Sequence, residues 1–113
     1  MVFVGAAFVV SVERYHRTGP PAQERRLREA AVEPLLRTHA KRDEVITALG
    51  VEFEDYSVGS TNRWVLERRV SIPRVRQAAD RYPVVLFHTT AWTMTWLFFD
   101  AEERLQDYYL CEQ

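Results

Sequence analysis

The sequence predicts an α+β fold: a two-layer sandwich in which helices pack on one face of an antiparallel sheet. Residues 22–49 hold two helical apolar patterns, and the second ends at Gly50, a residue type that commonly terminates helices in the left-handed conformation. Residues 92–98 instead carry their largest apolar side chains at every second position, a period of two that is typical of strands. Helices followed by strands favour separate layers over an alternating parallel fold.

The strongest strand pattern lies between Ala91 and Leu110 and predicts a β-hairpin around which the chain is organised. Its first half carries large apolar residues at every second position, namely Trp92, Met94, Trp96 and Phe98. Residues 100–103 supply the turn, and residues 105–110 form the return strand. Successive residues of a strand point to opposite faces, so this hairpin presents aromatic side chains on both.

The remaining elements follow in chain order. We expect a helix over residues 22–38, kinked or split at Pro34, whose buried stripe is Leu27, Ala30, Ala31, Pro34 and Leu35. A second helix over residues 42–49 is buried through Val45, Ile46 and Leu49. Residues 51–56 and 64–70 are expected as strands, and residues 72–82 as a short helix that Ser71 caps.

Length and composition indicate a single globular domain. The chain has 113 residues, of which 47% are hydrophobic and 27% are charged, and its formal net charge is -1. A charge this close to zero gives no general attraction to nucleic acid, so we expect no nucleic-acid partner. The charges fall in blocks, with basic residues in excess over 1–42 and 67–83 and acidic residues in excess over 43–66 and 84–113.

Residues 1–12 form an almost wholly apolar segment. The segment is shorter than the roughly 20 residues that span a bilayer, and no basic stretch precedes it as in a signal peptide. A piece of a membrane anchor and a buried strand both fit it. We favour the anchor, because residues 13–21 form a polar, proline-containing linker before a domain over 22–113. Residues 1–12 are then expected to contact a membrane or another chain.

Three stretches carry a family resemblance. Residues 42–50 form a helix ending in Leu-Gly, residues 59–69 a turn and an aromatic strand, and residues 93–105 a closing hairpin. Together they resemble the small outer-membrane lipoproteins of the SmpA/OmlA type, the BamE-like family, over residues 39–110. The chain departs from that family in lacking the lipid-bearing cysteine, since its only cysteine is Cys111, and in having Glu103 where the hairpin turn usually has glycine.

The resemblance implies the α+β fold and a place in the bacterial cell envelope, facing the periplasm. The cytoplasm is the alternative location, because a chain with one cysteine has no intrachain disulfide and fits either compartment. Members of the family act as accessory binders during envelope assembly. A similar arrangement of two helices on a sheet also occurs in protein inhibitors of enzymes. Fold alone does not determine function, so both kinds of binding protein stay open.

The residues that most often carry catalysis do not form a recognisable site in the sequence. His16, His39 and His88 lack metal-ligand spacing, and no phosphate-binding glycine loop is present. A pairing of His88 with Asp107 or Cys111 would be the catalytic arrangement to consider, but a half-buried strand histidine is the simpler interpretation. We therefore expect no enzymatic activity, no cofactor and no metal.

The aromatic residues of the hairpin are the candidate partner-binding residues. If helices cover one face of the sheet, one aromatic set stays exposed on the other, and the candidates are Trp92, Trp96, Phe99, Tyr108 and Tyr109. Tryptophan, tyrosine and arginine dominate protein–protein hot spots. The sequence thus predicts a non-enzymatic protein-binding domain of the cell envelope. The alternative is an immunity or inhibitor protein whose acidic blocks face the basic cleft of a toxin or enzyme.

Overall fold

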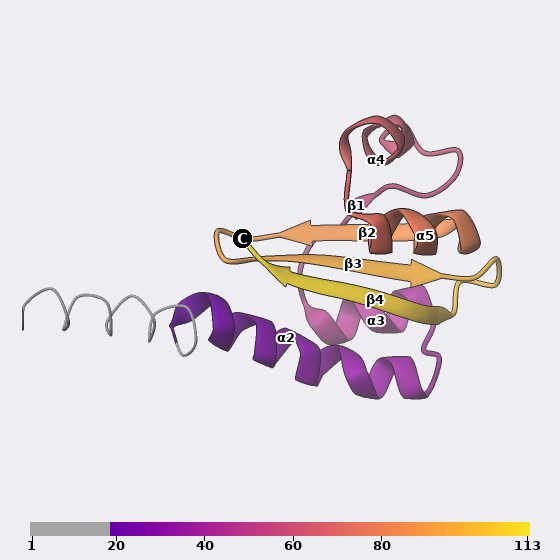
Figure 1. The fold of residues 1–113 in the computed structure, drawn as a ribbon. Coiled ribbons are helices and arrows are strands. Elements are labelled where there is room, and N and C mark those ends of the chain that lie inside the picture. Colours follow the sequence, from indigo (N-terminus) through magenta and orange to yellow (C-terminus); the bar gives the residue numbers. More distant parts are fainter. Residues whose placement is uncertain (1–18) are drawn as a thin grey trace, which may run out of the picture.

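The structure, a computed structural model, describes residues 19–113. Its helices are α2 (Pro20–Arg37), α3 (Arg42–Leu49), α4 (Arg63–Arg69) and α5 (Pro73–Arg81), and its strands are β1 (Glu54–Asp55), β2 (Val84–Thr89), β3 (Thr93–Phe99) and β4 (Leu105–Glu112). The strands form an antiparallel sheet in the order β1-β2-β3-β4 (Figure 1), which confirms the predicted α+β class. The expectation for residues 1–12 lies outside the described residues. Within residues 19–113, no helix is both long and apolar enough to cross a bilayer.

Helices α2 and α3 pack on one face of the sheet, as predicted (Figure 1). The buried cluster on this face draws residues from both helices and from β2, β3 and β4: Val32, Ala40, Val45, Leu86, Leu97, Phe99 and Leu105. Gly50 ends α3 with a φ of 65°, and its amide donates to the carbonyl of Ile46 at 3.0 Å. The predicted left-handed helix end is therefore confirmed.

The buried face of α2 differs from the predicted stripe. Val32 is fully buried, whereas Leu27 is 73% exposed and the other exposed members of the predicted stripe are Ala30, Ala31 and Pro34. The prediction failed because the first half of α2 meets the sheet through polar contacts, which an apolar pattern does not reveal. Arg25 lies 3.7 Å from the carboxylate of Glu112, and the hydroxyl of Thr90 donates to Glu24 at 2.8 Å.

Two prolines in α2 act differently from the prediction. The helix begins at Pro20, inside the expected linker, because a proline has no amide hydrogen to lose in the first turn of a helix. The helix also runs unbroken through Pro34. Pro34 takes a hydrogen bond away from the carbonyl of Ala30, but Ala30 is exposed and water can replace the missing donor.

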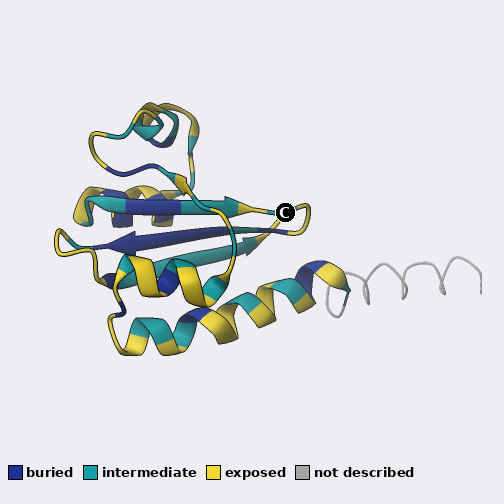
Figure 2. Cartoon of the chain, turned by 180° about the vertical axis from the view of Figure 1, so that it is seen from behind, coloured by how far each residue is buried: buried dark blue, intermediate teal, exposed yellow. Residues whose placement is uncertain are grey.

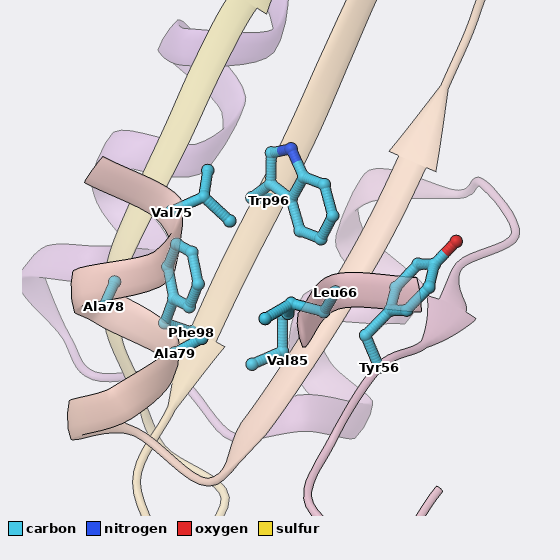
Figure 3. Close-up of a cluster of buried hydrophobic side chains, with 8 residues drawn as sticks. All are labelled: Tyr56, Leu66, Val75, Ala78, Ala79, Val85, Trp96 and Phe98. Atoms are coloured by element: carbon cyan, nitrogen blue, oxygen red, sulfur yellow. The ribbon is translucent and has the colours of Figure 1, made fainter. Parts of the chain in front are cut away.

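Helices α4 and α5 pack on the opposite face, which was expected to carry no helix (Figure 1). Strand β3 is buried along almost its whole length (Figure 2), so its apolar side chains need cover on both faces. The buried cluster on this second face is shown in Figure 3 and consists of Tyr56, Leu66, Val75, Ala78, Ala79, Val85, Trp96 and Phe98.

Residues 64–70 form most of helix α4 and not the predicted strand. The alternation of Trp64, Leu66 and Val70 breaks at residues 67–69, and arginine, leucine and glutamate are all good helix formers. An ion pair one helical turn apart, between Arg63 Nε and Glu67 Oε1 at 3.3 Å, adds to this preference. The strand over residues 64–70 was predicted from a short alternation of apolar residues, although the helix propensity of the segment is high.

The other local predictions are partly confirmed. Helix α5 is present as expected and buries Val75, Ala78 and Ala79, but Ile72 and not Ser71 precedes its first residue, and no side chain caps it. The strand expected over residues 51–56 is reduced to β1, whose two residues pair with Phe87 and Leu86.

Strands β3 and β4 form the predicted hairpin. Its turn is closed by Asp100, whose Oδ1 accepts hydrogen bonds from the amides of Glu102 and Arg104 at 2.9 and 3.0 Å. The bond from the Arg104 amide contributes most to holding the pKa of Asp100 below its usual range. Glu103 has a φ of 62°, a conformation that favours glycine.

Candidate functional site

The structure does not bring the predicted partner-binding residues together on one surface. Phe99 and Tyr108 face α2 and α3, whereas Trp96 and Tyr109 pair with each other on the face of α4 and α5. Trp92, which is 39% exposed, lies in the loop between β2 and β3. Trp96 and Phe99 are only 3% and 0% exposed and belong to the two cores. Residues adjacent along a strand point to opposite faces, which separates this set.

Tyr108 is engaged by α2. Its hydroxyl donates to the carboxylate of Glu33 and lies 3.5 Å from Oε1 of Glu29. Burial, reinforced by the hydrogen bond to Glu33, raises the pKa of Tyr108 above its usual range. The side chain therefore connects β4 to α2, and its hydroxyl is not free for a partner.

A pocket remains open on the face of α4 and α5. It has a volume of about 330 Å³ and is lined by Tyr56, Val65, Arg69, Val70, Ser71, Ile72, Phe87, Met94 and Trp96. One wall comes from α4 and the segment that leads into α5, and the floor comes from β2 and β3. The volume is at the lower end of the range for binding pockets, and the lining is mainly apolar with few polar groups, as is usual for such sites.

Three aromatic rings pack together at the floor of the pocket: Phe87 and Trp96 on the sheet, and Tyr56 beside them. The ring centroids of Phe87 and Trp96 are 4.2 Å apart, and the ring of Tyr56 lies 5.5 Å from each. The hydroxyl of Tyr56 donates to Glu54 Oε2 at 2.7 Å, and burial together with this hydrogen bond raises the pKa of Tyr56 to about 12. Mutual ring contacts hold these side chains in place, so the floor is formed before any ligand arrives.

The indole nitrogen of Trp96 is buried and has no hydrogen-bond partner within the described part of the chain. Buried indole N–H groups usually find an acceptor, and leaving one unpaired costs about 1–3 kcal/mol. In Figure 3 this nitrogen lies at the end of the ring that is directed away from Phe98 and Val85. The neighbouring residue on the same face of β3 is Met94, a pocket-lining residue whose flexible side chain can move to admit an acceptor.

Arg69 lies at the rim of the pocket and packs against Trp64, which is outside the lining. The guanidinium of Arg69 lies 5.4 Å from the centre of the Trp64 ring, and Trp64 is 49% exposed. Among the described residues, neither Arg69 nor its neighbour Arg68 forms an ion pair. The rim thus combines exposed aromatic surface with positive charge that no carboxylate compensates, a combination found in binding hot spots.

Arg63 holds α4 in position beside the pocket. Its guanidinium donates to the carbonyls of Tyr56 and Ala79, both at 3.3 Å, in addition to its ion pair with Glu67. The Ala79 carbonyl belongs to the last turn of α5, where a cation also interacts favourably with the helix dipole. Arg63 therefore joins α4, α5 and the segment after β1, and so determines where the rim lies.

The register of the sheet excludes the catalytic pairing of His88 with Asp107 or Cys111. His88 lies opposite Thr95, whereas Asp107 lies opposite Phe98 and Cys111 opposite Met94. Thr95 and Phe98 are on different faces of β3, so His88 is separated from both partners by the sheet. His88 Nδ1 instead lies 2.8 Å from the carbonyl of Glu52, and burial raises the pKa of the Cys111 thiol. Residues 19–113 contain no cluster suited to a metal ion.

Comparison with models of protein families, with curated proteins and with solved structures gives no match for this chain. Of the predicted candidates, Trp96 lies in the pocket. The rim residue Arg69 and its contact Trp64 were missed because their segment was expected to be a strand. The spacing of Val65 and Arg69, one helical turn apart, was the signal that would have placed both on one side of a helix.

Proposed function

We propose that this chain is a non-enzymatic protein-binding domain that takes a partner's side chain into the pocket on the face of α4 and α5. The observation that supports it best is the preformed aromatic floor, with an unpaired Trp96 N–H, beneath a rim whose arginine charge is uncompensated. A pocket with an apolar interior and a few polar groups at its edge is suited to anchor a partner's side chain.

The proposed location is the bacterial cell envelope. The resemblance of residues 39–110 to the BamE-like family supports it, and a partner among envelope assembly components follows from the same resemblance. The apolar sequence of residues 1–12 supports contact with a membrane. Membrane contact and partner binding would then use different parts of the chain.

A second candidate, an immunity or inhibitor protein, is favoured by the acidic edge of the sheet. Glu52 and Glu54 are exposed there and flank a hollow of about 260 Å³ beside Phe53 and His88. Such an edge complements the basic cleft of a nuclease or similar enzyme. In that case the captured partner is an enzyme whose activity the chain blocks, and neutralising both glutamates abolishes the block.

Affinity capture with a blocked pocket tests the proposed function. Ser71 lines the pocket and is exposed, so Ser71→Trp fills the mouth without disturbing the core. Ala31, exposed on α2, gives the matched control Ala31→Trp. Capture from the source cells followed by mass spectrometry should yield a protein that wild type and Ala31→Trp retain and Ser71→Trp loses. A partner retained equally by all three chains places binding elsewhere and overturns the proposal.

A further inference from the structure

We infer that the partner segment entering the pocket carries a carboxylate beside a large apolar side chain. This inference rests on the proposed function and specifies the chemistry of the partner. The apolar requirement comes from the pocket, whose floor consists of Phe87, Met94 and Trp96 and whose wall includes Val70 and Ile72. A polar side chain in this position would lose its hydration with few groups to replace it.

The carboxylate requirement comes from the charges around the mouth. Two other arginines of α4 and α5 already have carboxylate partners: Arg63 pairs with Glu67 at 3.3 Å and Arg74 with Asp107 at 2.5 Å. Arg69, the arginine that lines the pocket, has none within the described part of the chain. The positive charge of Arg69 is therefore available, and it lies at the edge of an apolar hollow where solvent screening is weaker than in open water.

The conformation of Arg69 is suited to a carboxylate. Its guanidinium is in contact with the Trp64 ring, so part of its conformational freedom has been lost before a ligand binds. A planar guanidinium can donate two parallel hydrogen bonds to one carboxylate. The N–H of Trp96, a lining residue, is buried without a partner among the described residues, and movement of Met94 would open it to an oxygen of the same segment. The guanidinium of Arg69, the apolar lining and the indole N–H together define the inferred ligand: an acid, an apolar group and an acceptor.

A pair of small probes isolates the contribution of the charge. N-acetylphenylalanine and N-acetylphenylalaninamide share the aromatic ring and differ in the carboxylate. Each is titrated into the ¹⁵N-labelled chain while the indole N–H signal of Trp96 is followed; Trp64→Phe and Trp92→Phe identify that signal. Both probes should shift it, and the carboxylate probe should bind about three- to ten-fold more tightly, an advantage that about 1 M salt largely removes.

The variants Arg69→Gln and Arg68→Gln provide the matched comparison. Both remove one positive charge from α4, but only Arg69 lines the pocket. Arg69→Gln should bring the two probes to equal affinity, and Arg68→Gln should leave the difference in place. Equal affinity of both probes for the wild-type chain identifies a neutral apolar occupant and overturns this inference while the proposed function stands.

Two further outcomes also contradict the inference. If neither probe shifts the Trp96 signal, the pocket does not bind and the proposed function fails with it. If the signal moves when the chain is diluted without a probe, and the probes compete with that change, the occupant of the pocket is a second copy of the chain. A dilution series alone therefore accompanies every titration.

Discussion

The two faces of the sheet differ in how completely helices cover them. On the α2/α3 face, Leu86, Leu97 and Phe99 are at most 1% exposed. On the α4/α5 face, Trp96 is buried but Phe87 is only partly covered, and a pocket of about 330 Å³ remains. Helix α2 has 18 residues and lies along the sheet (Figure 1), whereas α4 and α5 have 7 and 9 residues. The shorter helices leave part of an apolar face open.

The same strands supply both faces, so the difference comes from the covering layer. Successive residues of β3 are divided between the two cores: Leu97 and Phe99 on one side, Trp96 and Phe98 on the other. An apolar side chain in this sheet is therefore fully covered or left partly open according to the length of the helix above it.

Replacing one phenylalanine on each face should separate the two roles. Phe99→Ala, in the closed core, should lower the free energy of unfolding by about 3–5 kcal/mol. Phe87→Ala, at the floor of the open pocket, should cost about 1–2 kcal/mol, because solvent already reaches part of the side chain. Urea denaturation measures both losses in the free energy of unfolding, and the m-values should not change. Equal costs would mean that the two faces are packed equally well.

Arg63→Ala should destabilise helix α4 more than it destabilises the sheet. The side chain loses two hydrogen bonds to carbonyls and its ion pair, for a cost of about 1–2 kcal/mol. Amide hydrogen exchange should accelerate over residues 63–69 and stay unchanged over 42–49. Arg68→Ala, on the same helix but without an ion pair in the described chain, is the control and should change neither. Uniform acceleration throughout would show that α4 unfolds only with the whole domain.

Because of Tyr56, the free energy of unfolding should fall at alkaline pH. The folded-state pKa of Tyr56 is raised to about 12 from an unfolded value near 10. The neutral hydroxyl therefore stabilises the fold fully below pH 10, and this contribution is lost as the pH rises from 10 to 12. At pH 7, Tyr56→Phe should be less stable than wild type by about 1 kcal/mol. The gap should narrow between pH 10 and 12; a constant gap would mean that the hydroxyl is not held in the folded state.

The smallest effect is expected at the hairpin turn. Glu103→Gly and Glu103→Ala both remove the 3.4 Å contact with Arg42, but only glycine adopts a φ of 62° without steric cost. The glycine variant should therefore be more stable than the alanine variant by about 1 kcal/mol. Thermal unfolding of the two proteins gives the comparison. An alanine variant of equal or higher melting temperature would show that the turn relaxes.

Elements with a long or complete pattern were predictable from the sequence. The hairpin is one, since large apolar residues recur at every second position from Trp92 to Phe98, and the end of α3 at Gly50 is another. Helix α4 was not, because over seven residues its apolar positions fit a strand and a helix about equally well. The buried side of α2 was missed because Arg25, Glu29 and Glu33 make its contacts with β4.

The candidate site was predictable only in part. The sequence indicated aromatic surface on the face away from α2 and α3, and Trp96 does lie at the floor of the pocket there. It could not indicate that Phe99 is fully buried, since burial depends on which face receives the longer helix. Nor could it place Arg69 over Trp64, a contact that exists only when residues 63–69 are helical.

Hydrogen–deuterium exchange of the chain, alone and with its captured partner, tests most directly where the partner binds. Binding at the pocket should slow exchange over residues 63–72 and 87–96, which contribute its wall and floor. Exchange over residues 42–49, on the closed face, should not change. Slower exchange restricted to residues 24–31 and 42–49, with none over 63–72, would contradict the assignment of the open face to binding.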